Sequence, residues 1–401
     1  MKKRQGLIFY ILPFFVDAAF GILLICVPLL AIKMGANSLE LGGLGFIITL
    51  FYILFCVLFG KLSDRYKNGH LLWISFLTCS FLSFAFLLSH QLYQLFLFIG
   101  ILGMASAMFW PSIEVSIAKK GSGPLIKRTS RFNASWCLGS AIGFLAGGPL
   151  FQIDPRLPFY FSGLIFLILV FFIFTSVKEI NHFSPQDTSS KIDFPVPPDR
   201  SSSSYLYTAW IANFTLWFSI SIVRCLFPKL STNLGFSPSV LGILFTCISL
   251  AQTITFYALG KLSFWYYRKS ILIFTQMVAI VALIITFLTS DVLTFIGAFA
   301  LLGIAVGITH SASLFYTLNT SQNRGIRAGV HEGILGLGGL FGPLIGGILA
   351  TRYTLRAPYL LAVIVIGASI SAQIFFKFKR GNSSATKAPR HKGVISSRSS
   401  R

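Results

Sequence analysis

The chain has 401 residues, of which 55% are hydrophobic and only 11% are charged, and its formal net charge at pH 7 is +22. A soluble domain carries about 25% charged residues, so this composition excludes a soluble globular protein and predicts that lipid is the solvent. The charge does not indicate a nucleic-acid-binding protein, because the basic residues lie in short breaks between apolar runs and in the tail.

Apolar runs long enough to cross a bilayer, which takes about 20 residues, follow one another along the chain. The first run comes after three basic residues but has no clear small-residue cleavage site, so we interpret it as a retained helix rather than a signal peptide. The sequence thus predicts an all-α membrane protein with twelve transmembrane helices. The expected helices are 7–32, 39–60, 71–89, 92–118, 132–151, 157–177, 205–229, 238–259, 270–290, 292–318, 329–350 and 357–376.

One long polar segment divides these runs six and six. It contains "SPQDTSS", "FPVPPDR" and four serines, which is typical of a flexible linker without a core of its own. We therefore expect four parts: an N-terminal six-helix bundle (1–177), a cytoplasmic linker (178–204), a C-terminal six-helix bundle (205–376) and a disordered basic cytoplasmic tail (377–401).

The distribution of Lys and Arg predicts the orientation. When the N-terminus is placed in the cytoplasm, most of the 33 basic residues fall in cytoplasmic segments, as the positive-inside rule requires. The exceptions are Lys33, Arg156, Arg224, Lys229, Arg352 and Arg356. We expect a multi-pass protein of the cell (inner) membrane with both termini in the cytoplasm.

The two halves of the sequence align with each other at an offset of about 200 residues. Any single glycine match would be weak evidence, but six pairs of residues share this register: Pro28 and Pro228, Gly35 and Gly235, Gly42 and Gly242, Gly60 and Gly260, Gly103 and Gly303, and Gly139 and Gly338. With an even number of helices per half, the repeats must be parallel and related by an axis along the membrane normal. The sequence predicts two pseudo-symmetric six-helix bundles.

A charged turn, "GKLSDR" at residues 60–65, lies between two apolar runs, and "GKLS" returns at 260–263. This turn is similar to the signature between helices 2 and 3 of the major facilitator superfamily, which the chain resembles along nearly its whole length. The resemblance implies the twelve-helix fold of that family and a gating role for Gly60, Asp64 and Arg65, with Asp64 facing the positive N-terminal end of helix 11. The alternative for these charges is a topology anchor alone.

A second pattern, "GVHEGILGLGGLFGPLIGG" at 329–347, resembles the antiporter motif of exporters in this family, although it falls in helix 11 rather than in helix 5. Small residues four positions apart let two helices pack backbone to backbone, and Gly-Pro permits a bend. We expect Gly338, Gly342, Pro343 and Gly346 to form a tight contact that can rock. The motif does not establish the direction of transport.

Ionisable residues within apolar runs are costly, so they are candidates for function. Asp17 lies near the middle of helix 1, and an acid that is neutral in one state and ionised in another can couple proton flow to transport. His310 in helix 10 is a second candidate and a possible proton partner of Asp17; Arg224 and Glu114 are further candidates for substrate or proton binding. For each, a structural or solvated role is the alternative.

Four large or polar side chains on helices 4 and 7, namely Phe109, Trp110, Asn213 and Trp217, are expected to line a cavity suited to an aromatic or amphipathic substrate, unless they simply face lipid. Helix 4 departs from the family pattern, because Ile99 stands where its signature has an arginine. A drug-export mechanism that depends on this arginine is therefore not available to the chain.

These features predict a secondary transporter that moves a small organic solute by alternating access, coupled to protons, with efflux favoured. The alternatives are an uptake symporter for a sugar, nucleoside or other metabolite, and a non-transporting sensor or assembly protein with the same fold. The chain has no ATP-binding loop of the G-x4-G-K-[ST] type. We expect no enzyme activity, cofactor, metal or nucleic-acid partner; the expected partners of this monomer are its substrate, protons and the bilayer.

Overall fold

A computed structural model describes residues 2–65, 68–119, 124–181, 202–318 and 324–385. Within these ranges the chain is helical, without strands, and all twelve predicted helices are present. A short 3-10 helix, η1 (Phe86–Leu88), follows α3. The helices are α1 (Lys2–Lys33), α2 (Ser38–Arg65), α3 (Asn68–Ala85), α4 (Leu92–Lys119), α5 (Leu125–Ile153), α6 (Leu157–Asn181), α7 (Ser202–Asn233), α8 (Pro238–Leu259), α9 (Lys269–Leu288), α10 (Val292–Leu318), α11 (Arg324–Arg352) and α12 (Ala357–Ala385).

Several helices are longer than the apolar runs that predicted them. Helix α6 continues to Asn181, α7 begins at Ser202, and α12 continues to Ala385. The reason is that a helix satisfies its backbone hydrogen bonds internally, so it can continue into polar surroundings after the apolar run has ended. The centre of the predicted linker and the last residues of the tail lie outside the described residues.

Each of the twelve helices contains an apolar segment long enough to cross a membrane. Large apolar side chains are exposed along the sides of the molecule: Phe81 is 71% exposed, and Phe174 and Leu88 are each 70% exposed. Such surfaces are stable next to acyl chains and not in water. The chain is therefore a multi-pass integral membrane protein.

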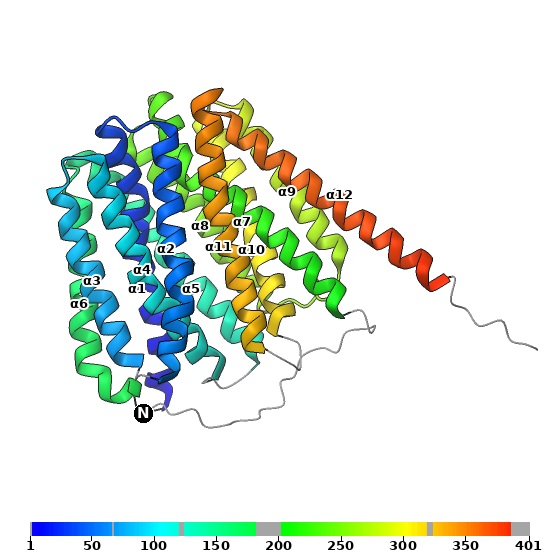
Figure 1. Cartoon of the computed structure of the whole chain (residues 1–401), viewed down its shortest axis with the longest axis horizontal. Helices are drawn as coiled ribbons and strands as arrows, with labels where there is room; N and C mark the ends of the chain where they lie inside the picture. Colours follow the sequence, from blue (N-terminus) through cyan, green and yellow to red (C-terminus); the bar gives the residue numbers. More distant parts are fainter. Residues whose placement is uncertain (1, 66–67, 120–123, 182–201, 319–323, 386–401) are drawn as a thin grey trace, which may run out of the picture.

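The helices form two bundles, α1–α6 and α7–α12, that lie side by side (Figure 1). The same pairs recur in both: α1 packs on α5 as α7 packs on α11, α2 on α4 as α8 on α10, and α3 on α6 as α9 on α12. The bundles meet through two related pairs, α2 with α11 and α5 with α8. The predicted pseudo-symmetric pair of six-helix bundles is confirmed.

The repeat is visible at the level of single residues. Gly35 and Gly235 follow α1 and α7 with φ angles of +93° and +77°, a conformation that residues with a Cβ rarely adopt. Gly103 and Gly303 are also equivalent, because a Cβ on either would lie 2.2 Å from a carbonyl oxygen, that of Ile48 or of Ile248. The register of the sequence repeat is thus the register of the fold.

The glycine pattern of α11 has two faces. Gly338 and Gly342 pack on the backbone of α7 within the C-terminal bundle, and Gly346 packs on α7 side chains. Pro343 and Gly347 face α2 of the other bundle, where a Cβ on Gly42 would lie 2.3 Å from the Pro343 carbonyl oxygen. One helix therefore joins its own bundle and also contacts the opposite one.

Helix α5 repeats this arrangement. Gly139 and Gly143 face the backbone of α1, and Gly148 faces α8, where a Cβ would lie 2.3 Å from the Pro238 carbonyl oxygen. Helices α2 and α8 begin, and α5 and α11 end, opposite the end that carries the N-terminus (Figure 1). The closest backbone contacts between the bundles therefore gather at this far end, where Lys229 Nζ of α7 also donates to the Ala36 carbonyl oxygen at 2.8 Å.

Candidate functional site

Asp17 lies inside the membrane-spanning part of α1 and is only 8% exposed. Its Oδ2 accepts a hydrogen bond of 2.9 Å from Ser140 Oγ of α5. The two helices approach closely here because glycines replace side chains: a Cβ on Gly143 would lie 2.2 Å from the Ala18 carbonyl oxygen. The close packing of α1 on α5 therefore places a hydroxyl group directly beside a buried carboxyl group.

Arg224 interacts with Asp17 electrostatically from the other bundle. It belongs to α7, is half-buried, and its guanidinium carbon lies 5.9 Å from the centre of the Phe144 ring of α5. No direct ion pair joins these two described side chains. The carboxyl group and the cation that acts on it are thus attached to different bundles, so the field at Asp17 depends on how the bundles are arranged.

His310 of α10 occupies a second cluster, made mostly of rings. The centre of its imidazole lies 5.5 Å from Phe256 of α8, 6.0 Å from Trp217 of α7 and 6.3 Å from Trp136 of α5. His310 is 7% exposed. Because Trp136 belongs to the N-terminal bundle and the other rings to the C-terminal one, this cluster also spans the interface between the bundles.

A second histidine, near the start of α11, is part of the same cluster. His331 of α11 is 1% exposed, and its ring centre lies 5.3 Å from that of His310. Its Nδ1 is 2.7 Å from Ser313 Oγ, and its Nε2 is 3.9 Å from a carboxyl oxygen of Glu332. An imidazole pair backed by an acid therefore connects α10 to α11.

Helix α5 connects the Asp17 and His310 clusters. Ser140 contacts Asp17, and Trp136, which contacts His310, precedes it by four residues. Residues four apart lie on the same face of a helix, about 6 Å apart along its axis. No described hydrogen bond or ion pair joins Asp17 to His310 directly; the two groups are neighbours along one face of α5.

Several buried polar atoms near this interface have no hydrogen-bond partner among the described atoms. They include both amide atoms of Asn213 and of Gln252, Trp217 Nε1, His310 Nδ1 and His331 Nε2. An unsatisfied buried polar group costs about 1–3 kcal/mol, so such a concentration in one region calls for a ligand or a functional reason. Donors and acceptors are both present, next to aromatic surface.

Gln252 was missed at the sequence level. It lies on α8 one turn before Phe256 and is 1% exposed. The available signal was an amide side chain in the middle of an apolar run, of the same kind that pointed to Asn213. Ser249, on the same helix face, accepts a hydrogen bond of 3.2 Å at its carbonyl oxygen from Cys137 Sγ of α5.

The other predicted residues have different surroundings. Phe109 is 1% exposed and packs on Phe76 of α3 inside the N-terminal bundle, at 5.5 Å between ring centres. Trp110 packs on Phe109 and, at 6.3 Å, on Trp136, which places it next to the His310 cluster. Four further predicted residues belong to described helices, but their surroundings lie outside the described part of the structure: Gly60, Asp64, Arg65 and Glu114.

The chain is similar to transporters over most of its length. A model of the Major Facilitator Superfamily matches residues 9–203 and 209–399. "Multidrug resistance protein 2" of Bacillus subtilis (strain 168) is 25% identical over 403 residues, covering 96% of this chain and 100% of that protein. "Quinolone resistance protein NorA" of Staphylococcus aureus (strain COL) is 22% identical over 380 residues, covering 92% and 95% of the two chains.

Solved structures share the fold. A bacterial homologue of the human lysosomal transporter Spinster, in an inward-facing and occupied conformation, superposes with a TM-score of 0.70 at 14% identity and covers 93% of this chain and 95% of its own. The nucleoside transporter NupG superposes with a TM-score of 0.67 at 13% identity, covering 92% and 98%.

Proposed function

Because the chain belongs to the Major Facilitator Superfamily, we propose that it is a proton-coupled exporter of small, amphipathic aromatic solutes. A transporter of small molecules, rather than an enzyme, is what the family itself establishes. The proposal adds the coupling ion, the direction and the kind of solute. It further holds that the chain works as a monomer in the inner membrane, with both termini in the cytoplasm, as the Lys and Arg distribution favours.

The observation that carries the proposal is the position of Asp17 relative to Arg224. A charged carboxyl group inside a membrane is costly unless a cation or hydrogen-bond donors offset its charge. Ser140 moves with Asp17, since α1 and α5 pack tightly in one bundle, whereas Arg224 moves with the other bundle. When the bundles rock, the cation approaches or recedes and the carboxyl group releases or takes up a proton. Conformation and protonation are thereby coupled.

The contacts between bundles support an alternating-access mechanism. Close backbone packing at Gly42 and Gly148 holds the far end shut. Glycine-lined contacts have no long side chains to disentangle, so they can separate and re-form as flat surfaces. If the far end and the N-terminal end open alternately, the Asp17 region is exposed to the two sides of the membrane in turn.

The kind of solute follows from the side chains around His310. Trp136, Trp217 and Phe256 provide ring faces, while the amides of Asn213 and Gln252 provide donors and acceptors. A planar solute with a few polar groups matches both features. The relatives named for multidrug and quinolone resistance favour export of such compounds.

The test uses the purified chain in liposomes with a pH gradient and a planar aromatic dye. An antiporter accumulates dye inside when the lumen is acidic, whereas a symporter accumulates it when the outside is acidic. We expect accumulation only with an acidic lumen, and we expect Asp17→Asn to abolish the effect of the gradient while leaving dye exchange between equal concentrations.

Ser140→Ala is the matched control, because it removes the hydrogen bond but keeps the acid, and should shift the pH dependence rather than abolish coupling. Gradient-driven accumulation by Asp17→Asn at the wild-type rate would contradict coupling through this residue. Accumulation with an acidic exterior would instead support the uptake symporter, and a complete lack of transport of any tested solute would favour the non-transporting alternative.

A further inference from the structure

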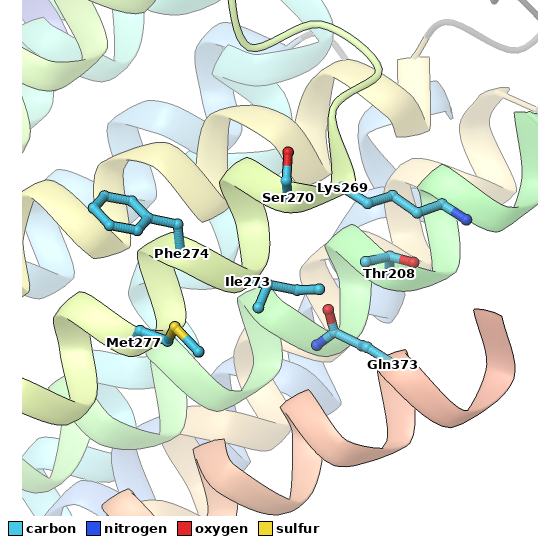
Figure 2. A pocket seen from close by; sticks show the side chains of 7 residues that line it. All are labelled: Thr208, Lys269, Ser270, Ile273, Phe274, Met277 and Gln373. Carbon is cyan, nitrogen blue, oxygen red and sulfur yellow. The ribbon is translucent and has the colours of Figure 1, made fainter. Parts of the chain in front are cut away.

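A cavity outside the interface between the bundles opens on the side of the C-terminal bundle. Its volume is about 230 Å³, and it lies between α7, α9 and α12. The residues that line it are Thr208, Lys269, Ser270, Ile273, Phe274, Met277 and Gln373 (Figure 2). Neither Asp17 nor His310 contributes to it, so it is separate from the candidate transport site.

The lining of this cavity is amphipathic. Phe274 and Met277 are 66% and 50% exposed and form an apolar rim on α9. The inner wall is polar: Gln373 of α12 is 8% exposed and is held by hydrogen bonds with Ser369 and Gln276. A bare hydrocarbon environment suits the rim but not this wall, whereas a lipid with a polar head and an acyl chain suits both.

The depth of the cavity matches the boundary of the bilayer. The apolar segments of three helices begin or end beside it: that of α9 begins at Lys269, that of α7 begins at Ser204, and that of α12 ends at Phe375. Lipid head groups lie at this level and acyl chains lie next to the following turns of α9. The polar part of the cavity is therefore at head-group depth and the apolar rim at acyl-chain depth.

The polar end of the cavity carries positive charge. Lys269 lies at the first position of α9 and extends towards α7 (Figure 2). Its ammonium group donates a hydrogen bond to Ser204 Oγ, and Nζ lies 5.0 Å from the centre of the Tyr205 ring. The positive charge of this amine also attracts a phosphate group at the membrane surface. Arg268 precedes it and is exposed, and the N-terminus of a helix itself favours an anion.

From this arrangement we infer that the cavity between α7, α9 and α12 binds an anionic phospholipid, with the head-group phosphate at Lys269 and an acyl chain along Ile273, Phe274 and Met277. The charge selects an anionic lipid over a zwitterionic one, because a zwitterion brings its own cation to the site. This site is distinct from the proposed transport site and would hold a lipid whatever the solute.

The experiment measures lipid retained by the purified full-length chain, by native mass spectrometry and by thermal unfolding. The probes are phosphatidylglycerol and phosphatidylcholine with identical acyl chains, and soluble glycerol phosphate as a head group without chains. We expect phosphatidylglycerol to bind and raise the unfolding temperature, phosphatidylcholine to bind more weakly, and glycerol phosphate to have no effect, because it cannot occupy the apolar rim.

Lys269→Gln should weaken phosphatidylglycerol binding about fivefold, as for the loss of one lysine charge near a membrane surface, and Lys269→Arg should restore it. Lys261→Gln is the matched control: Lys261 belongs to the same loop region and lies 4.2 Å from the Tyr257 ring centre, but it does not line the cavity. Met277→Trp, which fills the exposed rim, should reduce binding of both lipids.

Three results would overturn the inference: equal binding of the two lipids, equal loss with Lys269→Gln and Lys261→Gln, or an effect of glycerol phosphate as large as that of the lipid. The last result would indicate a site for a phosphate ion instead. If Lys269→Gln does not fold, comparison of Lys269→Arg with Met277→Trp still separates the charge from the apolar rim.

Discussion

Gly42→Ala tests whether close packing at the far end holds the two bundles together. The added methyl group would lie 2.3 Å from the Pro343 carbonyl oxygen, whereas ordinary contact begins at 3.4 Å. Helices α2 and α11 must therefore separate by about 1 Å, and such overpacking costs about 1–3 kcal/mol. If the cost falls only on the conformation with a closed far end, the ratio of closed to open molecules drops by a factor of about 5 to 150.

The assay measures the distance between spin labels at Asp154 and Asn233, which are exposed on opposite bundles at the far end. Labels attached through an introduced keto amino acid leave the native cysteines in place. We expect Gly42→Ala to populate longer distances than the wild type. Gly103→Ala is the control, since its methyl would meet Ile48 within one bundle, at 2.2 Å.

Two results would refute this reasoning. One is a folded Gly42→Ala protein with the distance distribution of the wild type, which would mean that α2 and α11 absorb the methyl group without parting. The other is an equal lengthening in Gly103→Ala, which would mean that general loss of packing, not the contact between bundles, moves the labels.

Further predictions concern stability and binding. Gln252→Leu should raise the unfolding temperature, because it removes buried amide atoms that lack partners, and should weaken solute binding about tenfold; an unchanged affinity in a dye-binding titration would remove Gln252 from the site. Arg356→Ala should destabilise the protein by about 1.5–3 kcal/mol, since Arg356 donates to the Phe287 and Thr289 carbonyl oxygens at the end of α9, and chemical unfolding measures this. Hydrogen bonds from the N–H and hydroxyl of Thr294 lower the pKa of Asp291 below its ordinary value of 3.8. The stability that ionised Asp291 provides to the folded protein is present above pH 3.8 and is lost as the pH falls through the lower pKa of the folded state. Asp291→Ala should therefore make the unfolding temperature less dependent on pH in the acid range.

The sequence identifies Asp17 as a functional candidate but does not identify its neighbours. Its cost inside an apolar run marks it as a functional candidate, because that cost depends only on the residue type and on the length of the run. The identity of its neighbours, by contrast, cannot be predicted from the residue type and the length of the run. Ser140 is 123 positions away along the chain and Arg224 lies in the other half, so only the packing of α1 on α5 and of α7 across the interface brings them together.

The His310 cluster shows the opposite limit. The sequence marks His310 in one apolar stretch and Asn213 and Trp217 in another, and it places His331 at the start of helix 11. In the folded protein His331 is 1% exposed and adjoins His310. Helix ends can be buried when another helix covers them, and the sequence of one helix contains no information about that covering.

Hydropathy and glycine register are local properties of the chain, so they predict the lipid environment, the number of helices and the internal repeat without knowledge of the packing. Three other features become apparent only in the folded protein: the α11 glycines face both α7 and α2, α5 contacts both the Asp17 and the His310 clusters, and Lys269 lies beside a cavity at the membrane boundary. These are relations between helices, and they follow from how side chains far apart in sequence fill shared space.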